Sequence, residues 1–337
     1  MSDKRPVTIK DIAQHAHVAV STVSRVLNNL DRVSPQTRQA VLKAVEDLGY
    51  VPNNLAASIV TGRTKLILIV VPDFINSFYG AVIQGAEQYL RRHDYLTMVT
   101  ATEDTENANI ATIIQKMSYA VDGAIIIPSL ATPEELNLFD KPIILVDRSI
   151  PGSKYTTVTV DNEGGTYQIT KELLDAGHTK IGIIVGSTKL NIGRDRLNGY
   201  LKALSDHNIP LNPDYIQIGN FYEEDGYHLM HKLLDLPSSP TAVVAGNNLI
   251  CIGCIRAIQD AGLHLGSNIS LVGFDDHNLA AAGKPGITVA DRPSVTMGEK
   301  AAELLLARLS SSEAVQQDDI VMDVTLIRRD SIAPPQT

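Results

Sequence analysis

The feature that most constrains the fold is a series of short apolar runs that begins at Leu66 and alternates with helical stretches. Seven of these runs are bounded by turn residues, and they read KLILIVVPD, YLTMVTAT, DGAIIIPS, KPIILVDRS, KIGIIVGS, AVVAGNN and SLVGFDD. Apolar strands that alternate with helices form parallel sheets covered on both faces. One series ends near Val160, a second begins near Lys180, and DVTLIRRDS supplies a last strand. We therefore expect an α/β core with two parallel sheets.

The N-terminal 50 residues follow a different pattern, with three short helical segments in close succession. Thr8 and Asp11 form a capping-box pattern, and Ser34 followed by Pro35 begins the third segment. Only residues 16–19 separate the first two segments, so these helices must cross sharply. This spacing predicts a helix-turn-helix. Its small core is expected to consist of Ala13, Val18, Val23 and Val26.

Charge is distributed unevenly along the chain. Residues 1–65 carry nine Lys and Arg against five Asp and Glu, a net charge of +4, whereas the whole chain has a formal net charge of −9. A basic segment on an acidic chain suits a polyanion such as DNA. The second helix would project short side chains and one arginine outward, groups that read base edges or phosphates. A small bundle that binds another protein is the alternative.

The segment TIKDIAQHAHVAVSTVSRVLNN, followed by VSPQTRQAVLKAVEDLGYVPNNLAASIVTGRT, resembles the DNA-binding headpiece and hinge of the lactose-repressor (LacI/GalR) family of bacterial transcription regulators. The resemblance extends over essentially the whole chain. It implies a two-lobed core like that of periplasmic sugar-binding proteins. The implied boundaries are 1–52 for the headpiece, 53–65 for the hinge helix and linker, 66–162 with 292–320 for the N-terminal lobe, and 163–291 with 321–332 for the C-terminal lobe.

Two headpiece residues depart from the family pattern. The family usually has Gly where this chain has His17, and Ser where it has Ala19. Histidine tolerates a positive φ comparatively well. The loss of a Ser cap costs about 1 kcal/mol, so we expect a headpiece that is less stable than those of its relatives.

The resemblance implies that a homodimer binds a near-palindromic double-stranded DNA operator. The hinge segment Asn53 to Thr61 would become helical on the operator, because nine residues cannot hold a helix alone. Ile59 would then wedge between base pairs in the minor groove, although a plain interdomain linker is the alternative. The expected DNA-binding residues are Thr8, Val20, Ser21, Thr22, Ser24, Arg25, Asn28, Ser34, Thr37, Asn53, Ala56 and Ile59.

The strand ends of the core carry groups suited to a polyhydroxylated ligand. Ligands of parallel α/β sheets bind beyond the carboxyl ends of the strands, and carboxylates, amides and guanidinium groups hold vicinal hydroxyls. Arg196 also matches the arginine that holds the effector in many relatives. We expect a small effector, a sugar or a sugar phosphate. Its expected binding residues are Phe74, Phe78, Asp147, Arg196, Phe221, Asn247 and Asp275.

Several residues of this expected cleft leave alternatives open. Asn248 stands where the family commonly has Asp, and Asp291 with Arg292 replaces the usual Arg-Gln. Phe274 and one of the first two phenylalanines could belong to the core instead. Arg148, next to Asp147, could form an ion pair that closes the lobes. These departures put the identity of the effector in doubt, but not the existence of a site.

Other functional classes find little support. The chain has no GxSxG, GxxxxGK[ST] or HExxH motif, and its nine His lack ligand spacing, so we expect neither catalysis nor a metal or cofactor. Cys251 and Cys254 form a lone CxxC, which we interpret as structural.

No segment approaches the roughly 18 apolar residues of a membrane span, so we expect a cytoplasmic protein. A sugar-binding protein of a transport system is the alternative for residues 66–330, but it would not carry a helix-turn-helix. We therefore expect a sequence-specific DNA-binding repressor of carbohydrate-utilisation genes, under allosteric control by the effector.

Overall fold

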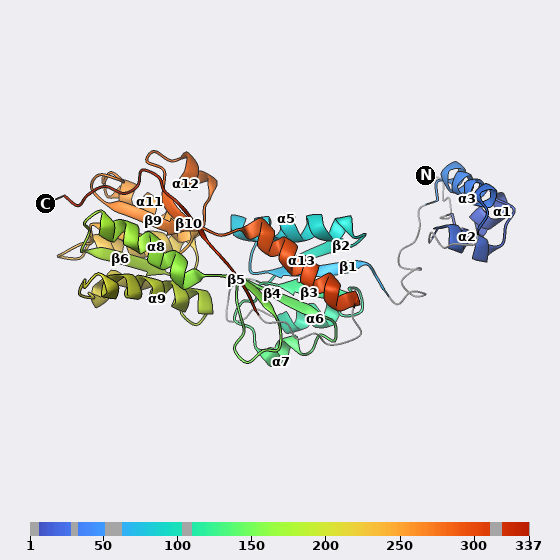
Figure 1. The fold of residues 1–337 in the computed structure, drawn as a ribbon, viewed down its shortest axis with the longest axis horizontal. Coiled ribbons are helices and arrows are strands. Elements are labelled where there is room, and N and C mark those ends of the chain that lie inside the picture. The colour runs from blue at the N-terminus through green and yellow to red at the C-terminus, as the bar shows by residue number, and fades with distance from the viewer. Residues whose placement is uncertain (1–6, 28–32, 51–62, 103–109, 311–318, 337) are drawn as a thin grey trace. The chain divides into compact units, whose positions relative to one another are not determined.

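The computed structural model describes residues 7–27, 33–50, 63–102, 110–310 and 319–336 (Figure 1). The chain forms two compact units, Met1–Thr64 and Lys65–Thr337. None of the helices in the described part of the chain combines the length and the apolar character that a membrane span requires.

The first unit contains the three predicted helices. They are α1 (Ile9–His15), α2 (Val20–Leu27) and α3 (Pro35–Leu48). Their buried core comprises Ile12, Ala13, Val23, Val26, Val41 and Ala44, with Val18 partly buried beside it. Each helix is too short to be stable alone, so the shared core holds the helix-turn-helix together.

The ends of these helices are formed as the sequence predicts. The Thr8 backbone N–H and hydroxyl both donate to the Asp11 carboxylate, at 2.8 and 2.7 Å. Ser34 Oγ accepts from the Thr37 N–H at 3.2 Å, and Gly49 ends α3 with a φ of 61°. His17 has a φ of 53° in the turn before α2, a positive value that histidine tolerates comparatively well.

The second unit contains two six-stranded sheets, and the strand order of the first is β11-β5-β4-β3-β1-β2. All its pairings are parallel. Its strands are β1 (Leu66–Val71), β2 (Leu96–Ala101), β3 (Gly123–Ile126), β4 (Ile143–Val146), β5 (Thr157–Val160) and β11 (Ile320–Met322). Its helices are α5 (Ser77–Arg92), α6 (Ile110–Met117), α7 (Pro133–Leu136) and α13 (Ser294–Ser310). We call this sheet and its helices the first lobe.

The second sheet has the order β12-β10-β9-β8-β6-β7 and is parallel except for β12, which pairs antiparallel with β10. Its strands are β6 (Ile181–Val185), β7 (Ile216–Ile218), β8 (Ala242–Ala245), β9 (Ser270–Phe274), β10 (Thr288–Asp291) and β12 (Thr325–Ile327). Its helices are α8 (Asn162–Asp175), α9 (Asn191–Asp206), α10 (Glu223–Leu234), α11 (Asn248–Asp260), α12 (Asn278–Ala282) and the 3-10 turn η1 (Pro213–Tyr215). These elements form the second lobe.

The chain passes between the lobes three times, from β5 to α8, from β10 to α13 and from β11 to β12 (Figure 1). The lobe boundary expected between residues 320 and 321 falls inside β11, and all three residues of β11 pair with β5 of the first sheet. The last crossing therefore follows Met322.

Both faces of each sheet are buried, as the apolar runs predict. Ile67, Ile69 and Val71 of β1 pack in the cluster that includes residues of α5 and α13. Leu68 and Val70 point to the opposite face, in a cluster with residues of α6 and α7. The alternation across one strand explains why β1 has no polar side chain.

Glycines allow α5 and α13 to pack backbone against backbone. A Cβ added at Gly85 would lie 1.9 Å from the Val295 carbonyl oxygen, and one at Gly298 would lie 2.0 Å from the Val82 carbonyl oxygen. Such distances are far below van der Waals contact, so a larger residue at either position must push the helices apart. The close packing of α13 keeps the segment after β10 in a fixed place.

Gly85→Ala is therefore expected to lower the free energy of unfolding by about 1–3 kcal/mol, the usual cost of overpacking. Gly80→Ala is the matched control, because Gly80 is exposed on the same helix and an added Cβ meets no atom within 4 Å. That variant should gain about 0.5–1 kcal/mol, since alanine favours a helix over glycine. Urea unfolding followed by circular dichroism measures both. Equal stability of the two variants would contradict the close-packing account.

Candidate functional site

The headpiece presents the N-terminal part of α2 to solvent. The Val20, Ser21 and Arg25 side chains are exposed, whereas Thr22 and Ser24 are half-buried. Thr8 and Ser34, at the starts of α1 and α3, are also exposed, and Thr37 is half-buried. The described members of the predicted DNA-binding set therefore include one helix face with short side chains and one arginine, as a recognition helix requires.

Four predicted DNA-binding residues lie outside the described residues. They are Asn28, Asn53, Ala56 and Ile59. The whole predicted hinge segment, Asn53 to Thr61, is among them.

Two aspartates follow strands of different lobes and have unusual backbone conformations. Asp147 follows β4 with a φ of 68°, and Asp275 follows β9 with a φ of 72°. A positive φ is strained for a residue with a side chain, and such strain gathers at functional sites. Both side chains are buried, so the two carboxylates need partners inside the protein.

Arg292 supplies those partners and joins the lobes. It follows β10 at the second crossing, where it donates to Asp275 through Nε at 2.5 Å and through Nη2 at 2.8 Å. Its Nη1 donates to Asp147 Oδ1. Burial alone would lower the pKa of Arg292, but the charges of Asp147 and Asp275 raise it. We call Asp147, Asp275 and Arg292 the clasp.

Arg196 lies on α9 in the second lobe and is almost fully buried. Its Nε donates to Asn162 Oδ1 at 2.9 Å and its Nη1 to the Gly246 carbonyl at 2.5 Å. Burial lowers the pKa of Arg196 to about 10. Its Nη2 has no hydrogen-bond partner among the residues that the structure describes, so this nitrogen retains a donor for a ligand.

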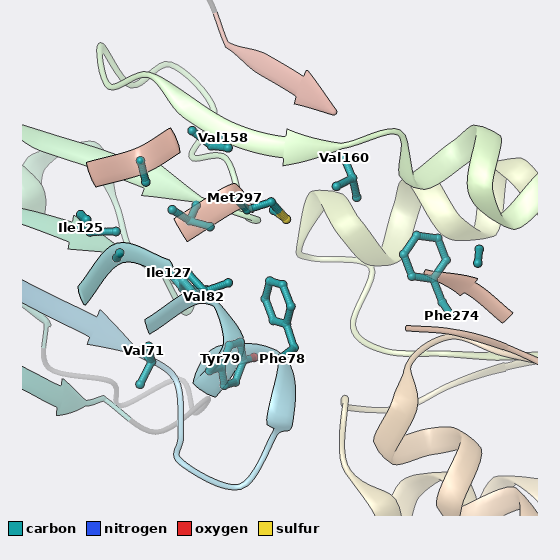
Figure 2. Packing of buried hydrophobic residues seen from close by; sticks show 14 of the residues in the cluster. Val71, Phe78, Tyr79, Val82, Ile125, Ile127, Val158, Val160, Phe274 and Met297 are labelled. Carbon is teal, nitrogen blue, oxygen red and sulfur yellow. The ribbon is translucent and has the colours of Figure 1, made fainter. Parts of the chain in front are cut away.

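Three of the cleft phenylalanines lie against arginines. The Arg292 guanidinium carbon is 3.4 Å from the Phe78 ring centroid, that of Arg196 is 3.8 Å from Phe274, and that of Arg148 is 5.6 Å from Phe221. Figure 2 shows Phe78 at the start of α5 in the first lobe and Phe274 at the end of β9 in the second. Aromatic faces attract cations, and these rings hold the guanidinium groups in place.

The suggested lobe-closing pair of Asp147 and Arg148 is wrong. Both residues follow β4 in the first lobe, and their atoms Oδ2 and Nε are 3.8 Å apart. Arg148 instead donates to Tyr79 Oη at 3.0 Å and to the Pro128 carbonyl at 3.2 Å, which also belong to the first lobe. Arg292 forms the ion pairs that join the lobes, and Arg148 contacts the second lobe through the Phe221 ring.

Two predicted effector residues have other surroundings than expected. Phe74 is 66% exposed, in a turn where Asp73 Oδ1 accepts from the N–H groups of Ile75 and Asn76. Asn247 caps α11, with Oδ1 accepting from Ile250 at 2.8 Å and Nδ2 donating to the Phe221 carbonyl at 3.1 Å. Both polar ends of Asn247 are therefore bound to the backbone.

Further hydrogen bonds connect the lobes near the clasp. Asn248 Nδ2 donates to Asn76 Oδ1 at 2.9 Å and to Ser77 Oγ at 3.2 Å, which joins the start of α11 to the start of α5. The Ser149 N–H donates to Asn191 Oδ1 at 3.1 Å. With the clasp, these contacts connect the two lobes.

The interpretation of the sequence did not assign Arg292 to the site, and noted it only as a departure from the family. Its position directly after a strand could have identified Arg292 as a site residue. That strand, β10, begins with Thr and ends with Asp, so the sequence shows no apolar run there. The contact between Asn76 and Asn248 could not be predicted from strand ends, because each residue lies at the start of a helix.

The geometry can be compared with known proteins. Residues 8–53 match a family described as bacterial regulatory proteins, lacI family, and residues 170–332 match a periplasmic binding protein-like domain. The ribose operon repressor of Haemophilus influenzae is 34% identical over 331 residues, which cover 96% of this chain and 98% of the relative. The transcriptional repressor CytR of Escherichia coli K12 is 32% identical, with 96% of each chain covered.

Solved structures agree over the full length. A lac repressor dimer bound to operator and the anti-inducer ONPF has a TM-score of 0.86 at 25% identity, and covers 98% of this chain and 100% of that one. A complex of the regulator CelR with cellobiose has a TM-score of 0.73 at 29% identity, over 97% and 100% of the two chains. The chain has both a helix-turn-helix and a two-lobed core, and it belongs to the lacI family of bacterial regulatory proteins.

Proposed function

We propose that this protein represses carbohydrate-utilisation genes by binding a near-palindromic operator as a homodimer, and that a sugar or sugar derivative between its lobes sets its operator affinity. The observation that carries the proposal is the combination of an exposed recognition face on α2 with a buried polar site between the lobes. One element suits DNA, and the other suits a small polar ligand.

The relatives favour a regulator over a sugar-binding protein of a transport system. Repressors align with 96% of the chain, including the helix-turn-helix. One relative is named for a ribose operon and one similar structure contains cellobiose, which supports a carbohydrate as the class of effector.

Coupling between the sites requires an element with two states. Arg292 and Asn248 join the lobes, and a ligand that binds one lobe arrangement better than another shifts the equilibrium between them. The lobe shift would change the spacing of the two hinge segments in a dimer. The hinge, Asn53 to Thr61, would then order or melt on the operator.

Arg25→Ala is expected to weaken operator binding by about 1–3 kcal/mol, because an arginine at this end of a recognition helix binds guanine or phosphate. The operator is first selected from random duplexes with the full-length protein, and footprinting should reveal two related half-sites. Fluorescence anisotropy then gives the affinity of each variant.

Lys43→Ala is the control, because Lys43 is exposed on α3 and its loss removes the same charge. We expect it to change operator affinity much less than Arg25→Ala does. Equal binding of the native protein to operator and to scrambled duplex would disprove sequence-specific regulation.

A further inference from the structure

The two carboxylates of the clasp are already bound to Arg292, which limits the class of ligand that can bind beside them. Asp147 and Asp275 are the groups that would accept hydrogen bonds from the hydroxyls of a neutral sugar. Arg292 takes both oxygens of Asp275 and one oxygen of Asp147. The face of Phe78 lies against the same guanidinium. Three of the four carboxylate oxygens therefore already accept from Arg292, and a neutral ligand must compete with a cation for them.

The groups that remain for a ligand are positively charged. Three buried arginines, Arg148, Arg196 and Arg292, face two buried aspartates, Asp147 and Asp275, among the described residues of the cleft. The charges of all four others act on Arg196. Among the described residues, Arg196 donates to the neutral groups of Asn162 and Gly246. A buried charge without a counter-charge is costly, so an anionic ligand would compensate the charge of Arg196.

Acids at the edge of the cleft do not supply that counter-charge. Asp276 is held by Arg329, which donates two hydrogen bonds to it at 2.7 and 2.9 Å. Asp291 accepts from the Asp276 N–H at 3.1 Å, and burial raises its pKa, which weakens it as a counter-charge. Asp195, next to Arg196, is only half-buried, and burial raises its pKa, which weakens it as a counter-charge.

We propose that Arg292 sets the charge class of the ligand: by occupying both strand-end carboxylates, it makes the cleft a site for an anionic ligand with a carboxylate or phosphate group. The donor poised for that group is Arg196 Nη2, which is buried and has no hydrogen-bond partner among the described residues. A guanidinium suits an oxyanion, because its hydrogen bonds to charged acceptors are stronger than those to hydroxyls. This inference rests on the proposed function and narrows its effector to acidic sugars and sugar phosphates.

The test compares matched neutral and anionic ligands by isothermal titration calorimetry at fixed ionic strength. The pairs are glucose with glucuronate and ribose with ribose 5-phosphate. In the native protein, the anionic member of at least one pair should bind about tenfold or more tightly than its neutral partner. Tighter or equal binding of the neutral member in both pairs, or no binding of any of the four, would overturn the inference.

Two variants test the role of Arg292 itself. Arg292→Gln releases both carboxylates, which repel an anion and accept hydroxyls, so the preference for the anionic member should vanish or invert. Arg292→Lys keeps the positive charge without the planar fork, and should keep the preference at reduced affinity. Two results would show that Arg292 does not act through its charge. One is an Arg292→Gln variant with the native ratio of anionic to neutral affinity, and the other is loss of the anionic preference in both variants.

Failure of this inference can be distinguished from failure of the proposed function. Thermal melts of each variant without ligand check folding, and the comparison in the native protein stands even if Arg292→Gln does not fold. The same native protein is tested on selected operator. Operator binding with a neutral-sugar preference removes only this inference, whereas the absence of any selected operator removes the proposed function.

Discussion

Replacing Arg196 by alanine is expected to remove most of the response of operator binding to the cleft ligand at a ligand concentration near the native dissociation constant. Its Nη2 retains a donor, and its Nε and Nη1 are held by Asn162 and Gly246, so the guanidinium is fixed in place before a ligand arrives. A hydrogen bond to a charged group contributes about 1.5–3 kcal/mol. Ligand affinity should therefore fall by roughly ten- to a hundredfold. Calorimetry measures the affinity, and anisotropy with labelled operator measures the response.

Arg194→Ala is the matched control for this prediction. Arg194 lies on the same helix, but it is exposed and donates to the carbonyls of Thr188 and Lys189 at 3.3 Å. That variant should bind ligand and respond like the native protein. Because Arg196 also bonds within the second lobe, thermal melts must accompany the titration. A folded Arg196→Ala variant with a normal response would remove Arg196 from the site.

The second large effect is expected at Ile59, in the hinge segment outside the described residues. If Ile59 wedges into the minor groove, its side chain offsets the cost of unstacking a base step, roughly a few kcal/mol. Ile59→Ala should then lose much of the operator affinity and most of the DNA bend, while its fold, dimerisation and ligand binding stay unchanged. Gel-shift titration measures affinity, and a circular-permutation assay measures the bend.

Ile59→Leu is the control, because leucine keeps an apolar wedge of similar size. It should keep or improve both affinity and bend. If Ile59→Ala binds and bends the operator like the native protein, the hinge is only a linker, and coupling through its order must be abandoned.

The sequence predicts those parts of the site that depend on neighbouring residues alone, such as apolar runs and helix caps. Asp147 and Asp275 were predicted because each directly follows an apolar run, and parallel strands bring such ends together. The headpiece was predicted for a similar reason, since its caps and its short turn constrain the backbone locally.

The pairing of these groups could not be predicted, because it depends on contacts between distant segments. Arg292 meets Asp147 across 145 positions of sequence. The strand before Arg292, β10, begins with Thr and ends with Asp, so no apolar run marks Arg292 as a strand-end residue. The alternative that Phe274 and one of the first two phenylalanines belong to the core is confirmed, because Phe78 and Phe274 are buried in one apolar cluster. Their rings lie against arginines. Asn247 was predicted from its strand end, where capping of α11 uses the same amide.

The central claim is that one protein couples a ligand between its lobes to an operator on its headpiece. The most direct measurement is the dissociation constant of the selected operator at fixed salt, with and without a saturating ligand from the calorimetric panel. We predict a change of roughly 5- to 150-fold, the usual range of coupling, and reciprocity requires operator to change ligand affinity by the same factor. Equal operator affinity with and without bound ligand would contradict the account.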